Sequence, residues 1–480
     1  FNEFTLEEFL PPSTLTVEID DMGGVSLRGQ ISFCKSGLNE RFIGALRVGI
    51  PSLGQINLYA DFGTQRDNLE AEFNSAQYFN FFAIEGSVIL SSGIVLFPGV
   101  ALYGLGGGVY HHMRRTAPLP TLNMERVSET SGARVASADR GSMPPATPIS
   151  CASAPFEPHF ETFMGFGFKA YLGDNGGGSA YNFDVEIEAV IRGNPDGSVE
   201  GLQSLTFNGN LYVQSDIGKG DSNAPLRGEV LVAYTRGIDG DRTYEGIHGT
   251  IGVYLNVYGV VTGSGPENKM VDAVFHVDNR DMWYFYLGAP QGIQSQNFPS
   301  PGTNGGFSPY PGPCGIRALS TLELDAYFMM GKGIPDLPPI NPKIEAIMAR
   351  AAGDPSQNQV EQRVASTDEL PRTPNPEEMN PADGFAHGIN FELNGTFNFL
   401  LFYASLEVIL GYNINVRQYP DRTCLILDPA RRSSSERPIG INYWYAKGNA
   451  YAGLRGELGI GVDFGFFKAA IPILEMGCAI

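Results

Sequence analysis

The sequence has no long apolar runs, no closely spaced cysteines and few basic residues. No run of about 18 apolar residues occurs, which excludes a transmembrane helix. The five cysteines lie far apart without a C-x-x-C pair, so a zinc or iron–sulfur site is not expected. With 32 basic and 52 acidic side chains the net charge is −20. We therefore expect the chain to repel nucleic acid and anionic membrane surfaces.

The common catalytic motifs are also missing. The sequence contains no G-x-S-x-G, H-E-x-x-H or P-loop pattern. Glu186 and Glu188 lie two residues apart, where a strand would place both on one face, as a glycosidase places its acid and nucleophile. A solvated sheet surface explains such a pair better. We expect a protein that is not an enzyme, with no catalytic, cofactor-binding or metal-binding residues and no cofactor.

Two short clusters resemble binding motifs. Gly104 and Gly106–Gly108 could suggest a phosphate loop, but no amphipathic helix follows them, and close packing of a strand is the better interpretation. His111 and His112 are adjacent, so on a strand they would face opposite ways and would not share a metal ion.

Acidic turns and single cysteines complete the set of candidate sites. The turns at Asp174, at Asp216–Asp221 and at Asp239–Asp241 could bind calcium, but none has the twelve-residue loop pattern, and Asx turns are favoured. In an exported protein, up to two long-range disulfides could form among the cysteines. Their positions are Cys34, Cys151, Cys314, Cys424 and Cys478. We expect Cys151 and Cys314 to be loop cysteines available for pairing.

The residues that are abundant predict β-structure. The 60 glycines, 33 prolines and 11% aromatic residues are typical of strands, turns and irregular loops. In Leu400–Val416 every even position is apolar, while Ser405, Glu407, Asn413 and Asn415 lie among the odd positions. This period of two predicts one strand of roughly 55 Å with two distinct faces. We expect water on its polar face; a second sheet, a partner subunit or lipid could cover its apolar face.

The same pattern divides the chain into blocks. We predict a mainly β protein with long antiparallel strands in extended sheets, one or two short helices and long Pro/Gly-rich loops. The expected parts are a β block over 1–115, a Pro/Ser/Ala-rich linker or crossing loop over 116–158, a β block of hairpins over 159–335, a helix with a charged Pro-rich excursion over 336–384, and a β block over 385–480. The apolar end of the chain leads us to expect that it continues beyond Ile480 or pairs there with a partner.

Four local predictions follow from the pattern. Ile94–Leu105 is almost wholly apolar and predicts a strand buried on both faces. Asp184–Ile191 and Leu205–Val213 predict a hairpin around an Asn-Pro-Asp-Gly turn. Asn341 is expected to cap a helix that starts at Pro342 and ends at Gly353. In the 116–158 segment, seven prolines are expected to exclude regular structure.

Several motifs occur in an order found in one group of proteins. They are Tyr103-Gly-Leu-Gly-Gly-Gly-Val-Tyr-His-His-Met, Met164-Gly-Phe-Gly-Phe-Lys-Ala, Met330-Gly-Lys-Gly-Ile-Pro, Gly440-Ile-Asn-Tyr-Trp-Tyr-Ala-Lys-Gly-Asn-Ala-Tyr-Ala and Ile471-Pro-Ile-Leu. From about Phe81 onward the chain resembles the very large exported proteins of Bacteroidota of the TANFOR-domain type. The resemblance implies a segment of a giant, mostly β, secreted or cell-surface protein, and it implies no catalytic residues.

Three non-catalytic functions are compatible with these observations. The first is a structural β-rich segment of a large extracellular or cell-surface assembly, adhesive or filamentous. The second is lipid or hydrophobic-ligand binding in an open β groove. The third is an outer-membrane β-barrel, to which alternating strands rich in glycine and aromatics point. The expected partners are other protein subunits or further segments of the same polypeptide, with lipid as a further possibility and no nucleic acid.

Overall fold

The computed structural model describes most of the chain. The described residues are 13–22, 25–36, 39–50, 53–66, 78–116, 154–194, 198–215, 224–239, 242–290, 311–312, 314–319, 321–332, 334–335, 337–351, 383–399, 402–419, 423–428, 433–438, 440–463 and 468–479. Of these residues, 80% lie in strands and 3% in a helix, and the strands pair in antiparallel fashion, so the predicted mainly β class is confirmed. The chain forms two compact units, Phe1–Ile247 and His248–Ile480. The division between them falls inside the block expected over 159–335.

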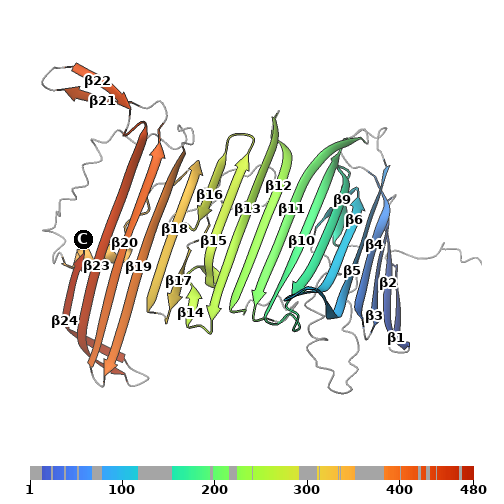
Figure 1. Cartoon of the computed structure of the whole chain (residues 1–480), viewed down its shortest axis with the longest axis horizontal. Coiled ribbons are helices and arrows are strands. Elements are labelled where there is room, and N and C mark those ends of the chain that lie inside the picture. Colours follow the sequence, from blue (N-terminus) through green and yellow to red (C-terminus); the bar gives the residue numbers. More distant parts are fainter. Residues whose placement is uncertain are drawn as a thin grey trace, which may run out of the picture. The chain divides into compact units, whose positions relative to one another are not determined.

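The first unit is built from strands that pair mostly with their neighbours in sequence. They are β1 (Ser13–Met22), β2 (Val25–Ser36), β3 (Asn39–Ile50), β4 (Gly54–Arg66), β5 (Tyr78–Phe97), β6 (Val100–His111), β7 (Met113–Arg115), β8 (Phe156–Pro158), β9 (Thr162–Gly173), β10 (Tyr181–Gly193), β11 (Val199–Val213) and β12 (Leu226–Asp239). Pairing runs from β1 to β6, then from β6 to β9 and on to β12, while β7 and β8 form a separate short hairpin. Figure 1 shows these strands in blue to green.

The second unit has the same antiparallel organisation with one helix. Its elements are β14 (Val261–Gly263), the 3-10 helix η2 (Pro266–Asn268), β15 (Lys269–Asp278), β16 (Trp283–Leu287), β17 (Cys314–Ala318), β18 (Leu322–Lys332), α2 (Pro342–Ala351), β19 (Asp383–Phe399), β20 (Phe402–Gln418), β21 (Thr423–Asp428), β22 (Ser433–Pro438), β23 (Trp444–Asp463) and β24 (Lys468–Ala479). The strands β18, β19, β20, β23 and β24 pair in that order (Figure 1). Strand β13 (Arg242–Val257) spans the division between the units.

Local patterns predicted several of these elements. The hairpin around the Asn-Pro-Asp-Gly turn is confirmed, since β10 and β11 pair along their lengths with Ile187 opposite Phe207. The helix is confirmed from Pro342, and Asn341 caps it by accepting a hydrogen bond from the Lys343 amide at 3.0 Å. Its expected end at Gly353 lies outside the described residues.

Two local predictions are wrong. The apolar stretch Ile94–Leu105 is not one strand buried on both faces, because the chain turns at Pro98–Gly99 and the side chains from Ile94 to Phe97 are more than half exposed. Pro155 and Pro158 do not exclude regular structure, because the short strand β8 begins directly after Pro155, ends at Pro158 and pairs with β7. Pro158 lies at the end of a short strand, where a missing amide is tolerated.

The alternation in Leu400–Val416 is confirmed as β20, but the exposure of its two faces is the reverse of the expectation. On the polar side Asn413 is 6% and Asn415 4% exposed, whereas Leu406 is 41% and Leu410 47% exposed on the other side. The polar side faces the chain's own covering segments, and the apolar side is open. Water on the polar side was therefore the wrong prediction.

The same reversal occurs across each unit, and it defines two surfaces. We call the open side of each unit its apolar face and the opposite side its polar face. Exposed residues on the apolar face include, in the first unit, Leu58, Phe62, Ile84, Leu105, Phe166, Phe168, Ile187 and Leu205, and in the second, Leu324, Phe328, Met330, Phe385, Ile389, Leu406, Leu410, Leu454 and Leu458. Buried polar residues on the polar face include Asn57, Asp61, Glu85 and Ser87, and Asp325, Glu392, Asn413 and Asn415.

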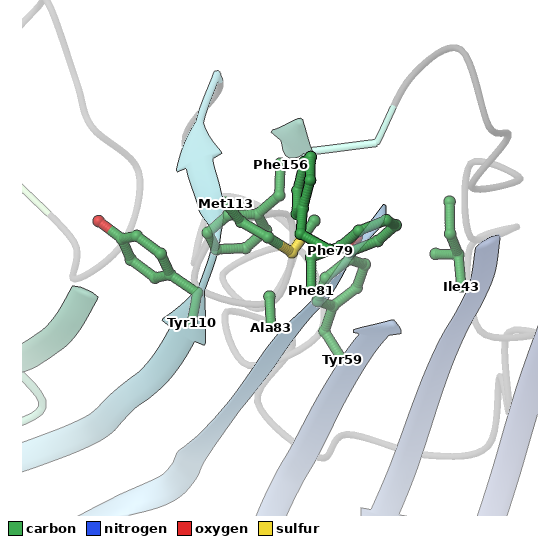
Figure 2. Packing of buried hydrophobic residues seen from close by; sticks show 8 residues of the cluster. All are labelled: Ile43, Tyr59, Phe79, Phe81, Ala83, Tyr110, Met113 and Phe156. Carbon is green, nitrogen blue, oxygen red and sulfur yellow. The ribbon is translucent and has the colours of Figure 1, made fainter. Parts of the chain in front are cut away.

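A segment of the chain lies over the polar face in each unit. In the first unit the β7–β8 hairpin brings Met113 and Phe156 onto Tyr59, Phe81 and neighbouring side chains, and Figure 2 shows this buried cluster. In the second unit α2 packs Ile344 and Ile347 against Ile409. In each unit this covering segment, which we call its cover, buries polar residues of the strands beneath it. Among the described residues, no helix has the length and apolar character needed to cross a membrane.

Candidate functional site

A cluster of charged side chains lies beneath the β7–β8 hairpin of the first unit. The Arg115 guanidinium contacts three carboxylates: Glu85 at 2.9 Å, Glu186 at 2.7 Å and Glu188 at 3.3 Å. Tyr110 donates a hydrogen bond to Glu188 at 2.8 Å. The Arg115 side chain is only 12% exposed, so the ion pairs are largely withdrawn from water.

The strand register explains why this cluster forms. Glu85 pairs with Gly108, Gly108 with Gly167, and Gly167 with Glu188, so two carboxylates flank two glycines in one row. A Cβ atom on Gly167 would lie 2.8 Å from the Arg115 guanidinium. The glycines therefore leave the space in which Arg115 lies across the sheet.

The cluster extends along β9 and β10. Lys169 lies 3.5 Å from Glu186 and 3.9 Å from Asp184, and Asn210 donates a hydrogen bond to Asp184 at 3.1 Å. Two cations among these residues face four carboxylates, counting Glu85 and Glu188. With Arg115 bound to both Glu186 and Glu188, the pair is no solvated sheet surface, and that interpretation is corrected. The arrangement anchors the hairpin to the sheet.

The two adjacent histidines lie at the base of the same hairpin. Their ring centroids are 4.0 Å apart, because His112 has a φ of 49° and leaves the strand conformation. The expectation that they face opposite ways is therefore wrong. Nδ1 of His112 lies 2.7 Å from the Phe160 carbonyl oxygen, and His111 has the equivalent contact to Phe163. Both rings therefore bind backbone carbonyl groups near the start of β9. Among the described residues, no group of three or more His, Cys, Asp or Glu side chains has a geometry that could hold a metal ion.

Burial lowers the pKa of two histidines beside this hairpin, His112 and His159. Burial lowers the pKa of His112 despite its contact with the Phe160 carbonyl, and neighbouring His111 and His159 add to the effect. Burial also lowers the pKa of His159, with a smaller contribution from Arg114. Both rings lie beyond the ends of β6 and β9, and both favour the neutral form.

The remaining sequence candidates have structural roles. The glycines Gly104–Gly108 lie inside β6, and a Cβ on Gly108 would meet Glu85 Cγ at 2.2 Å, which confirms the packing interpretation. Asp174 accepts hydrogen bonds from the amides of Gly176 at 2.7 Å and Ala180 at 2.8 Å, as predicted for an Asx turn. The stretch Asp216–Asp221 and Asp241 lie outside the described residues.

The cysteines divide into bonded and free thiols. Cys34 is disulfide-bonded, whereas Cys314 and Cys478 are free. Cys314 is not a loop cysteine available for pairing, as the sequence had suggested. It lies in β17, buried, with its sulfur 3.1 Å from the Asp272 amide nitrogen. Cys151 lies outside the described residues.

In the second unit the polar face carries a hydrogen-bonded network. Tyr327 donates to Asn413 at 3.0 Å, and Asn413 donates to Asn449 at 2.8 Å. Glu392 accepts from Asn341 at 2.8 Å and pairs with Lys343 of the helix. Burial opposes the charge of Lys343, but Glu392 outweighs it and raises the Lys343 pKa. Polar groups beneath α2 thus bind one another.

The apolar face of the first unit carries an aromatic row near one end of its strands. Phe33 and Phe42 have ring centroids 4.6 Å apart, and Phe42 and Phe62 are stacked at 5.3 Å. Phe62 is the register partner of Phe82, whose ring lies 5.6 Å from that of His111. Five successive strands, β2 to β6, contribute to this row.

Sequence reasoning missed both Arg115 and the aromatic row. Arg115 meets Glu186 from 71 positions away, and no local period connects them. The row combines single phenylalanines from separate strands, which only the register brings together. Comparison of the chain with protein-family models, curated proteins and solved structures yields no match.

Proposed function

We propose that this chain is a non-catalytic, membrane-embedded part of an outer-membrane β-barrel, and that its apolar face contacts lipid. The observation that carries the proposal is the reversal of burial, in which large apolar side chains are exposed and polar side chains are covered in both units. In water, contiguous apolar patches larger than a few hundred Å² are rare on monomeric proteins. In an outer-membrane strand, apolar residues point outward and polar residues inward.

The register supports contact with lipid because residues of the apolar face follow one another in continuous rows across paired strands. In the second unit Leu324 pairs with Phe391, Phe391 with Leu410, and Leu410 with Ala452. In the first unit the row runs from Leu58 through Gly86 and Gly107 to Phe168 and Ile187. Scattered apolar residues need no explanation, but rows across paired strands form a surface.

Strand length also agrees with a membrane. From Phe402 to Val416 the apolar positions of β20 cover 14 residue steps. At about 3.3 Å per residue and a tilt of about 45°, these steps rise roughly 33 Å. The hydrocarbon core of a bilayer is about 30 Å thick. A strand that is unusually long for a soluble protein has the length of a membrane strand.

The aromatic row and the disulfide add support. Outer-membrane strands carry aromatic girdles where the apolar band ends, and the row from Phe33 to Phe82 lies near the ends of β2–β5 on the apolar face. A disulfide at Cys34 is typical of an oxidising, extracytoplasmic compartment. Because a sheet edge in lipid would leave backbone groups unpaired, the strands are expected to close with one another or with further segments.

The resemblance to giant exported Bacteroidota proteins is compatible with this role. Such a resemblance implies a segment of a larger polypeptide at the cell surface, where a membrane-embedded part would be expected. In such a protein the long strands would form part of a barrel that spans the membrane. The expected partners of these strands are lipid and further segments of the same protein.

Arginine substitutions at three depths along β20 test the proposal. Phe402, Leu406 and Leu410 are all exposed on the apolar face. For the protein refolded into phospholipid vesicles, Leu410→Arg near the strand centre is expected to lower the free energy of unfolding by about 2–4 kcal/mol, and Phe402→Arg at the strand end by about 0–1 kcal/mol. Leu406→Arg is expected to lie between them. Urea titration measures the three values.

A matched control makes the result specific. Tyr258 is 86% exposed in the turn after β13, and Tyr258→Arg is expected to leave stability unchanged. A detergent-free, soluble chain in which Leu410→Arg costs less than about 0.5 kcal/mol would overturn the proposal. A soluble oligomer that Leu410→Arg dissociates would instead assign the apolar face to a second copy, and this outcome also overturns it.

A further inference from the structure

A cavity of about 310 Å³ lies on the polar face of the second unit. Strands β18, β19, β20 and β23 form its floor, and the proline-rich segment before α2 borders it. Its polar lining comprises Asp325, Tyr327, Asn341, Asn390, Asn413 and Tyr451. This volume is at the lower end for small-molecule sites. The cavity is independent of what covers the apolar face.

The cavity lining offers negative charge and hydrogen-bond acceptors. Asp325 is 7% exposed and is the one acidic residue in the lining, which contains no Lys, Arg or His. Four prolines, at 290, 338, 339 and 342, also line the cavity, and proline carries no amide hydrogen that could donate to an anion. Such a wall disfavours anions, and the net charge of −20 adds to this preference.

The polar donors of the cavity lining are directed into the protein's own network. Tyr327 donates to Asn413, Asn413 to Asn449, and Tyr451 to Asn390 at 3.1 Å. Asn390 in turn donates to Glu392 at 3.2 Å. These bonds fix the side chains in place and engage the hydroxyl donors of both tyrosines within the protein.

Two tyrosines provide a further feature. Tyr327 and Tyr451 both line the cavity, and Tyr327 is 8% exposed. The face of an aromatic ring attracts a cation, by about 0.5–2 kcal/mol according to how far water is excluded. The proline rings and Ile389 offer apolar surface beside them, which suits a short methylene chain.

We propose that this cavity binds the ammonium group of a small organic amine, with Asp325 as its counter-ion and Tyr327 and Tyr451 as aromatic walls. Ser264 holds the Asp325 carboxylate in place by donating a hydrogen bond at 2.5 Å. Arg317, Glu323 and Glu392 are the other charged groups that act on Asp325. Arg317 contacts Glu323 at 2.9 Å, and Lys343 contacts Glu392.

Isothermal titration of the purified full chain with three four-carbon probes tests the proposal. The probes are butylamine, 1-butanol and butyrate. Butylamine is expected to bind about tenfold or more tightly than 1-butanol, because a hydrogen bond to a charged group contributes about 1.5–3 kcal/mol. Butyrate is expected not to bind. Equal affinity for butylamine and 1-butanol in the unmodified protein overturns the proposal without any variant.

Two variants identify the counter-ion. Asp325→Asn is expected to weaken butylamine binding about tenfold while leaving 1-butanol binding unchanged. The charge-matched control is Glu457→Gln, because Glu457 lies on β23 outside the cavity and bonds Tyr403 and Arg455. If Glu457→Gln weakens butylamine as much as Asp325→Asn, the effect is one of net charge and the proposed site is wrong. Should Asp325→Asn fail to fold, Tyr451→Leu supplies the second variant, with a severalfold loss expected for butylamine only.

Discussion

The two segments that cover the polar faces are held in different ways. In the first unit the β7–β8 hairpin is anchored by Arg115, which contacts three glutamates, and by Phe156, which is 1% exposed. In the second unit α2 is anchored by Ile344 and Ile347, and its Lys343 pairs with Glu392. The first cover relies on one arginine bound to three carboxylates together with aromatic packing, and the second relies on aliphatic packing with a single ion pair.

Both covers use glycine on the sheet beneath them. A Cβ on Gly167 would lie 2.8 Å from the Arg115 guanidinium, and one on Gly453 would lie 2.5 Å from Ile344 Cδ1. Because glycine has no side chain, each of these positions leaves space on the sheet for a large side chain of the covering segment. That side chain is a cation where carboxylates surround the glycine and an aliphatic group where apolar residues do.

The largest expected effect comes from removing the cation of the first cover. Arg115→Met leaves Glu85, Glu186 and Glu188 without their shared partner, and breaking a buried ion pair typically costs about 3–5 kcal/mol. Urea unfolding of the refolded protein measures the change. The control is Arg114→Met, whose partner Glu157 is 43% exposed, with an expected cost of about 0–1 kcal/mol. Equal costs for the two variants would show that the cluster does not anchor the hairpin.

The second cover is expected to respond to loss of volume. Ile344→Ala removes a side chain that is 1% exposed and is expected to cost about 2–4 kcal/mol. Met348→Ala, on the same helix but 41% exposed, is expected to cost less than about 0.5 kcal/mol. Hydrogen exchange of the helix amides gives the local stability directly. An Ile344→Ala protein with unchanged exchange would mean that α2 is held by something other than its apolar side.

The smallest expected effect is a pH dependence of stability that affects the β7–β8 hairpin but not α2. Folding lowers the pKa of His112 and His159, so these two side chains bind more protons in the unfolded state than in the folded state as pH falls below about 6.5. Stability contributed by these neutral rings is present above that pH and is lost as pH falls through the depressed folded values. Acidification from pH 7.5 to 5 is therefore expected to lower the protection factors of the Met113–Arg115 amides, that is, their protection relative to the intrinsic exchange rate at each pH.

The double variant His112→Gln/His159→Gln is expected to remove this pH dependence. The amides of α2, which packs on Ile409 and Gly453 and pairs Lys343 with Glu392, serve as the internal reference. An equal loss of protection in both covers would assign the effect to carboxylates and would contradict the histidine explanation.

The sequence by itself determined the elements. Alternation in Leu400–Val416, the turn signal between β10 and β11, and the cap at Asn341 each depend on neighbouring residues, and each appears in the structure. A period of two follows from strand geometry alone. Antiparallel, mainly β organisation was predictable for this reason.

Only the tertiary structure decided which side of each strand is covered. The same alternation describes a strand with its apolar side packed and one with its apolar side open, because the pattern contains no information about the surroundings. Arg115 reaches Glu186 across 71 positions, and a φ of 49° at His112 turns its ring toward His111. Such contacts depend on register and on how the chain returns over the sheet, and those are properties of the whole fold.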